Sequence, residues 1–256
     1  MQDLRTIVVT TRIIQYLGYA SLLGLISYSL FNSWWWFLAS ILYYKFIVGL
    51  FSNQISQHRY ISHNSFKTGA LRHKFLAWAS LLTSVSPVLY ASIHRHHHNH
   101  SDTEKDPHSP SISIWHALGS LNKEELSKIR PALDVMRDRD FMFIHKHGQK
   151  IFVLLFAIVF IISWKIAVFI LLAGVGWNHL HMTVIRSALV HMKLPGSYKN
   201  FELADNSWNN KWIHAFDLGE GLHNNHHRYP NRYNEACVPG EFDFAGWIVK
   251  KFFATS

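Results

Sequence analysis

Charged residues are scarce in this sequence. Asp, Glu, Lys and Arg make up 16% of the 256 residues, well below the roughly 25% usual for soluble globular domains. Cysteine occurs once, as Cys237, which excludes an intramolecular disulfide framework, a Cys-x-x-Cys redox pair and a cysteine-rich zinc module. Hydrophobic residues instead reach 49% and aromatic residues 15%, which excludes a disordered chain. The length suits one domain, and an ordinary soluble protein is disfavoured.

Long apolar segments predict an all-α, multi-pass membrane protein with four spans in two hairpins. The first segment has 19 residues without a formal charge, enough to reach about 28 Å as a helix. The second begins with Trp34-Trp35-Trp36, typical of an interfacial aromatic belt, and is interrupted only by Lys45. A third apolar region, broken at Ser163-Trp164-Lys165, is too long for one span and predicts a second hairpin. The four predicted spans cover residues 13–31, 34–51, 149–163 and 166–190. The alternative is four core helices of a soluble protein, which so low a charged fraction disfavours.

The distribution of Lys and Arg predicts the orientation in the membrane. Residues 52–148 hold twelve of them and the segment after Val190 holds seven, whereas each tight turn has at most one. The positive-inside rule therefore predicts that both termini and the active site lie on the cytoplasmic side. We expect a single domain, 1–256, with a cytosolic cap from residues 52–148 and 191–256. The net charge of +9 fits contact with anionic lipid, and no motif predicts nucleic-acid binding.

Histidine is abundant, with 19 residues, and it gathers at three places in the predicted cap. Two clusters share the pattern His-x-x-His-His, which on a helix places three imidazoles within about 100° and predicts that they meet at one point. The third is His-x₄-His, whose members lie about 140° apart on a regular helix, so we expect them to bind two different ions or to flank a bend. Neutral imidazole is the commonest metal ligand. The eight residues suit two ions: His58, His63, His94, His97, His98, His223, His226 and His227.

The remaining histidines are expected to be ordinary polar residues, with His96 and His100 outside the ligand set although they lie within the second cluster. Two others, His179 and His181, lie near the cytoplasmic end of the fourth predicted span, where an ionisable residue is a functional candidate. Their role stays open. The metal also stays open at this point, because a nitrogen-rich site binds zinc more tightly than Fe(II).

Three histidine boxes, HRYISH (58–63), HRHHHNHSD (94–102) and GEGLHNNHH (219–227), resemble those of the membrane fatty-acid desaturases, most closely the delta-9 branch that includes stearoyl-CoA desaturase. Further likeness lies in SFKTG (65–69), SDTEKDPHSP (101–110), DNSWNN (205–210) and EFDFAGW (241–247). The resemblance covers roughly residues 13 to 250. It implies a four-helix membrane stem and a cytosolic cap that holds two Fe(II) ions.

The resemblance also implies a ninth ligand, from a segment of the type Asn-Ser-x-x-His at the end of the fourth span. Here the comparable stretch is Ser187-Ala-Leu-Val-His191, so His191 takes the ligand position and Ser187 replaces the usual Asn. This departure puts the family's water-mediated contact to one iron in doubt. Imidazole ligands need acceptors that fix the orientation of their rings, and we expect Asp102, Asp106 and Glu220 to serve. No substrate-binding residue is assigned.

The activity implied is an oxidoreductase that introduces a cis double bond, at the delta-9 position, into a saturated acyl chain. Dioxygen is the oxidant, and a separate ferredoxin or cytochrome is expected to supply electrons, because no haem-binding domain fits within this length. The acyl carrier, CoA or lipid, is left open. One alternative is a membrane di-iron hydroxylase acting on a lipid, sterol, alkane or carotenoid. Another is a non-catalytic metal-binding or transport protein, whose ligands would lie near the bilayer midplane.

Overall fold

A computed structural model describes residues 4–118 and 123–255, which are mostly helical with almost no strand. The first half of the chain contains α1 (Leu4–Phe31), α2 (Trp35–Tyr43), η1 (Tyr44–Ser62), α3 (Ala70–Ala79), η2 (Ser80–Thr83), α4 (Pro87–His100), α5 (Ile114–Leu118) and α6 (Lys123–Lys128). The second half contains α7 (Leu133–Arg137), α8 (Arg139–Ile162), η3 (Ile166–Leu172), α9 (Ala173–Leu180), η4 (His181–Arg186), η5 (Leu189–His191), β1 (Ser197–Tyr198), β2 (Asn209–Asn210), α10 (Lys211–Phe216), α11 (His223–Arg228), α12 (Phe244–Ile248) and η6 (Val249–Phe253). The two short strands pair antiparallel.

Four helices are long and apolar enough to cross a membrane, which confirms the predicted all-α membrane fold. Side chains that face outward on them are apolar, including Leu23, Leu30 and Ile161, as expected for contact with lipid. The four cover Thr6–Phe31, Trp35–Ser62, Arg139–Ile162 and Ile166–His191. The first three reach beyond the predicted segments 13–31, 34–51 and 149–163, because these helices continue into more polar residues at one end.

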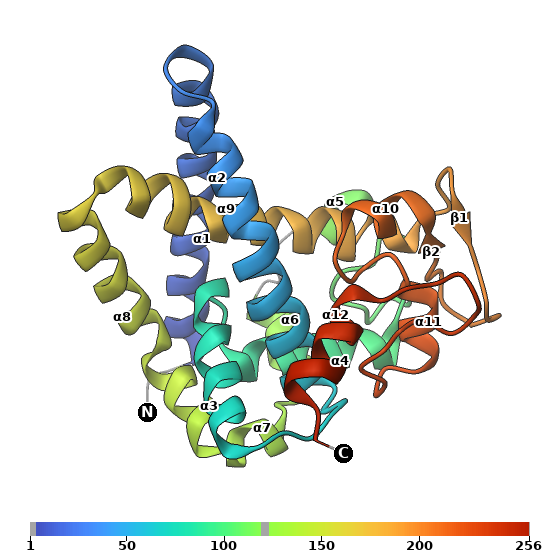
Figure 1. Ribbon diagram of the computed structural model, residues 1–256. Helices are drawn as coiled ribbons and strands as arrows, with labels where there is room; N and C mark the ends of the chain where they lie inside the picture. Colours follow the sequence, from blue (N-terminus) through green and yellow to red (C-terminus); the bar gives the residue numbers. More distant parts are fainter. Residues whose placement is uncertain (1–3, 119–122, 256) are drawn as a thin grey trace.

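The turn between the first two spans lies far from the elements that carry histidine. The turn between α1 and α2 projects at the top of Figure 1, whereas α4, α11 and α12 gather toward the other end. Two helices there, Ala70–Thr83 and Pro87–His100, meet at 82° and reach a membrane-like composition only as a bent pair. Since α4 carries a histidine box, we assign this pair to the polar end. The boundaries of the predicted cap stay a prediction.

The stem is held together where α1 crosses α9 at two glycines. A Cβ added at Gly176 would lie 2.5 Å from the carbonyl oxygen of Gly18, so the two backbones touch directly. Small residues allow such close approach, which favours helix association within lipid. Larger side chains then fill the adjoining space, where Ile14, Phe152 and Val175 form a buried cluster. This crossing sets the height of the fourth span relative to the first.

A second apolar core fixes the polar end to the second span. Leu50, Ile55 and Leu76 pack with Phe253 and its neighbours in η6, so the C-terminal helix closes against the extension of η1. The helix α4, which packs in a neighbouring cluster through Val88 and Ala91, begins with a local sequence signal. Pro87 occupies the first turn of α4 while Ser86 accepts a hydrogen bond from the Leu89 N–H at 3.3 Å, the arrangement expected at a helix N-terminus.

The crossing predicts that Gly176→Ala destabilises the protein by about 1–3 kcal/mol, because the methyl group meets backbone rather than a flexible side chain. Thermal unfolding of the purified protein in one detergent measures the effect. Gly24→Ala is the matched control, since a Cβ there meets nothing within 4 Å. Equal unfolding temperatures for Gly176→Ala and the parent protein would show that the crossing is looser than described.

Candidate metal centre

Nine histidines converge at the polar end in two adjacent groups. The first ring group is His58, His63, His94, His98 and His226, and the second ring group is His97, His191, His223 and His227. Within each group, ligand nitrogens lie within 4.8 Å of one another. The groups adjoin, with the ring centroids of His98 and His227 4.5 Å apart. The structure therefore brings together all nine residues named from the sequence; their assignment as ligands remains a prediction.

The expectation that His58 and His63 bind two different ions is wrong, because both belong to the first ring group. Its premise was a regular α-helix, but η1 is π-helical. The N–H of His63 donates to the carbonyl of His58 at 3.1 Å, an i→i+5 bond typical of a π-helix. This wider turn brings residues five apart onto one face.

The expectation that each His-x-x-His-His pattern points at one locus is also wrong. In α4, His94 and His98 join the first ring group while His97 joins the second. In α11 the middle histidine, His226, joins the first ring group, while His223 and His227 join the second. Residues at i+4 and i+3 lie about 40° and 60° to opposite sides of residue i, so each helix serves two neighbouring centres.

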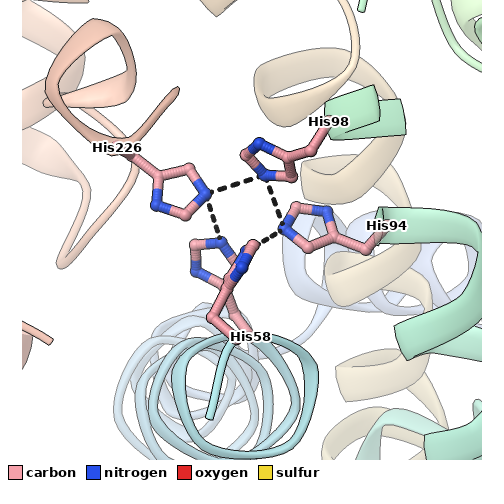
Figure 2. Close-up of side chains that lie close together, drawn as sticks. His58, His94, His98 and His226 are labelled. Atoms are coloured by element: carbon pink, nitrogen blue, oxygen red, sulfur yellow. Dashed lines mark hydrogen bonds between the residues drawn. The ribbon is translucent and has the colours of Figure 1, made fainter. Parts of the chain in front are cut away.

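The spacing of the nitrogens suits a metal ion in each group. Figure 2 shows His58, His94, His98 and His226 turning ring nitrogens toward a common centre. The Nε2–Nε2 separations are 3.0 Å for His58–His226 and 3.2 Å for His94–His98, and in the second ring group 3.0 Å for His191–His223. Two nitrogens bound at about 2.1 Å and at right angles lie about 3.0 Å apart. Facing lone pairs repel, and a cation between them removes that repulsion.

Carboxylates orient the second ring group. Asp106 bonds Nδ1 of His97 and Asp102 bonds Nδ1 of His191, each at 2.9 Å, as predicted for these two residues. Asp205 bonds Nδ1 of His227, also at 2.9 Å, and the sequence analysis gave it no role. Each acceptor holds the Nδ1 proton and leaves the Nε2 lone pair for a metal. Asp205 is the first residue of DNSWNN (205–210), one of the segments that carry the family resemblance, so that resemblance could have identified it as a candidate.

Burial keeps His223 and His227 neutral and able to bind metal. The pKa of His223 lies well below its usual value, mainly because the ring is buried and also because the imidazole of His227 lies close to it. Burial likewise lowers the pKa of His227 to about 4, against the opposing effect of Asp205. Burial alone would raise the pKa of Asp102, but its hydrogen bond to His191 and the other donors hold it below the usual value. Asp102 is therefore charged at pH 7, and His223 and His227 are neutral.

In the first ring group, an amide lies beside one Nδ1 atom and a carboxylate beside another. Glu235 Oε1 lies 3.4 Å from Nδ1 of His226. Gln54 Oε1 lies 3.3 Å from Nδ1 of His58, and the Gln54 amide donates to Glu220. Glu220 also forms a buried ion pair with Arg186 and lies 3.8 Å from Nδ1 of His223, beyond hydrogen-bond reach. Arg186 and Gln54 both contact Oε1 of Glu220, whereas Oε2 is the oxygen nearer His223. The expected role of Glu220 in orienting a ring stays a prediction.

Other residues named from the sequence lie outside both ring groups. Ser187 is buried, and its hydroxyl donates to the Met182 carbonyl at 2.9 Å. His181 bonds Asp217 at 2.8 Å, and His96 and His100 stack beside each other without joining either group. His73, expected to be an ordinary polar residue, lies near two carboxylates, Asp138 and Asp140.

A cavity of about 160 Å³ adjoins both ring groups. It lies between α1, α4 and the α9–η4 segment, and its walls include His94 from the first group and His97 from the second. Apolar side chains, among them Leu89 and Ile93, line it together with Arg186. A ligand in this cavity would therefore contact residues of both centres.

Comparison with known protein families finds that the model of the fatty acid desaturase family matches residues 33–235. This match confirms the resemblance carried by the three histidine boxes. "Delta-9 acyl-lipid desaturase 2" of Arabidopsis thaliana is 26% identical over 231 residues, covering 85% of this chain and 72% of that protein. "sn-1 stearoyl-lipid 9-desaturase" of Anabaena variabilis is 28% identical, covering 75% and 71%. "Acyl-CoA C20 Delta5-desaturase" of Anemone leveillei is 28% identical, covering 80% and 67%.

The Nδ1 contacts predict that Asp102→Asn and Asp106→Asn each weaken metal binding about 10- to 100-fold, because the orienting carboxylate is lost. Competition with a chelator of known affinity measures this on the purified protein. Glu104→Gln, an exposed carboxylate in the same loop, is the control and should bind metal like the parent. Unchanged affinity in both Asp variants would remove the carboxylates from the metal centre.

Proposed function

Because this chain belongs to the fatty acid desaturase family, we propose that it is an oxygen-dependent acyl desaturase acting at the delta-9 position. The cavity that adjoins both ring groups carries the proposal. It places a bound chain beside His94 and His97, one residue from each candidate metal position. A transport role would instead place ligands near the bilayer midplane, whereas these rings lie at the polar end of the spans.

We propose two irons as the cofactor, held by the nine histidines of the two ring groups. The donor set supports this: nitrogen lone pairs converge at metal-binding spacing, and buried carboxylates fix three of the rings. The bound irons supply the activation of dioxygen. The chain's residues hold the metals, and the apolar walls of the cavity exclude water from the acyl chain.

The reaction removes one hydrogen from each of two adjacent carbons, which then form the double bond. Dioxygen accepts two electrons from the acyl chain and two from an external donor. With two protons from solvent and the two hydrogens removed, it leaves as two molecules of water. Since the described residues contain no second redox group, we propose a separate ferredoxin or cytochrome as donor, acting at the cytoplasmic side that the positive-inside rule predicts.

The position of the double bond is proposed from the relatives and the histidine boxes together. The relatives named above from Arabidopsis and Anabaena are named as 9-desaturases of acyl lipids, whereas the Anemone relative is a Δ5-desaturase of acyl-CoA. A further relative, from Moorena producens, is named "Hex-5-enoyl-[acyl-carrier protein] acetylenase". The relatives thus differ in the bond that they form and in its position. Product analysis is therefore needed to locate the double bond that this chain introduces.

Metal content tests the ligand assignment. Protein from iron-replete cells should hold close to two irons, and His226→Ala and His223→Ala should each lower the iron content by about one ion by removing a ligand from a different group. Elemental analysis gives the count. His96→Ala, a histidine of the second box that joins neither ring group, is the control and should keep both irons. A single zinc in the parent protein would contradict the redox assignment.

Product analysis tests the activity. In a host that lacks delta-9 unsaturation, expression of this chain should restore monounsaturated acyl chains, while His226→Ala should produce none because one metal centre is broken. Mass spectrometry of derivatised lipids locates the double bond and identifies the lipid class that first carries it. His96→Ala should retain activity. Hydroxylated chains in place of alkenes would instead support the hydroxylase alternative.

A further inference from the structure

A lysine lies inside the second span. Lys45 is eleventh in the candidate span Trp35–Ser62, and an ionisable residue at such a position suggests a functional site. Its ammonium donates to the carbonyl oxygen of Phe216 at 2.5 Å. Within residues 4–118 and 123–255, the structure records no carboxylate at ion-pair distance from Lys45. The positive charge is therefore solvated by one backbone carbonyl but is not neutralised.

Helix packing places Lys45 at the boundary between the apolar stem and the polar end. Gly18 of α1 touches Gly176 of α9. From that crossing, Arg12 and His181 lie about 9 and 8 Å toward the polar end, at 1.5 Å per residue. The ring of Tyr44, next to Lys45, lies 6.0 Å from that of His181. The Lys45 side chain extends from there to the Phe216 carbonyl of α10, so its ammonium lies where the spans meet the polar elements.

A cavity of about 480 Å³ opens beside Lys45, on the other face of the fourth span from the cavity described above. Its walls are mainly apolar and aromatic, and they come from the second span, the fourth span and α10: Tyr44, Trp177, Leu180, Val184, Ile185, Trp212, Ile213 and Phe216. Lys45, His181 and Asp217 are its polar residues. His181 and Asp217 bond each other at 2.8 Å, so the carboxylate of the cavity already has a partner other than Lys45.

Two further observations indicate a ligand from the membrane. His181 is 91% buried, and its Nδ1 has no hydrogen-bond partner among the described residues. The short helix α10, which forms one wall, exposes Trp212 by 64% and Phe216 by 72%. Large aromatic side chains exposed beside a lysine are typical of the membrane–water interface. Basic pockets between spanning helices at this height bind lipid headgroups.

We propose that this cavity binds one membrane phospholipid with an anionic headgroup. Lys45 and the free Nδ1 of His181 face the phosphodiester, and the apolar wall of the fourth span faces an acyl chain. Charge complementarity favours an anionic over a zwitterionic lipid, because the site offers one ammonium and its only carboxylate already bonds His181. The site is separate from the metal centre, so the proposal does not depend on the desaturase activity.

Native mass spectrometry of the full-length protein tests the site. The protein is reconstituted into vesicles of equal phosphatidylglycerol and phosphatidylcholine, extracted again, and the lipids retained per chain are counted. We expect one phosphatidylglycerol to be retained preferentially. Lys45→Met should lower that preference about fivefold, the effect of one basic residue near a membrane surface, and Lys45→Arg should keep it.

Lys165→Met is the matched control, because Lys165 lies in the turn between the third and fourth spans, where it donates to the Tyr28 hydroxyl at 2.9 Å. It should leave the preference unchanged. Metal content confirms that each variant is folded. Equal lipid ratios for the parent and Lys45→Met would overturn the proposal, as would equal losses in the Lys45→Met and Lys165→Met variants. Retention of free fatty acid or phosphatidylcholine instead, or of no lipid, would also overturn it.

Discussion

Mutual repulsion among buried nitrogen lone pairs is the constraint on which the rest of this structure depends. Rings from four separate stretches of chain meet with Nε2 atoms near 3 Å apart, for example 2.8 Å between His63 and His94 and 3.0 Å between His98 and His226. Burial lowers the pKa of His226 well below its usual value, so protonation does not separate the rings. Cations that bind them convert this repulsion into cohesion, and metal binding then contributes to folding.

The helices are shaped to meet this constraint. The two spans that deliver ligands, the second and the fourth, become π-helical toward the polar end, over η1 and η4, and π-helical turns are frequent at functional sites. Buried charges support the arrangement. Arg59, in the first histidine box, pairs with Glu235 and Asp243 at 3.1 and 3.0 Å and so ties the second span to the segment after α11. Breaking such a buried pair from one side is strongly destabilising.

Much of this architecture could be predicted from the sequence because its signals are local. Apolar segments show the four spans. The histidine boxes contain eight of the nine rings that converge, and the segment 187–191 supplies the ninth, His191. The distribution of those rings between two centres could not be predicted. It depends on the i→i+5 bonding of η1 and on the direction from which α4 and α11 approach. The partner of Glu220 could not be predicted either, because Arg186 reaches it from another helix.

The central claim is that two metal ions bind, one in each ring group. Anomalous diffraction from crystals of iron-loaded protein at the iron absorption edge tests it most directly, because it locates the metal independently of activity. The account predicts two peaks, one among the rings of His58, His94, His98 and His226 and the other among those of His97, His191, His223 and His227. A single peak, or peaks away from these rings, would contradict it.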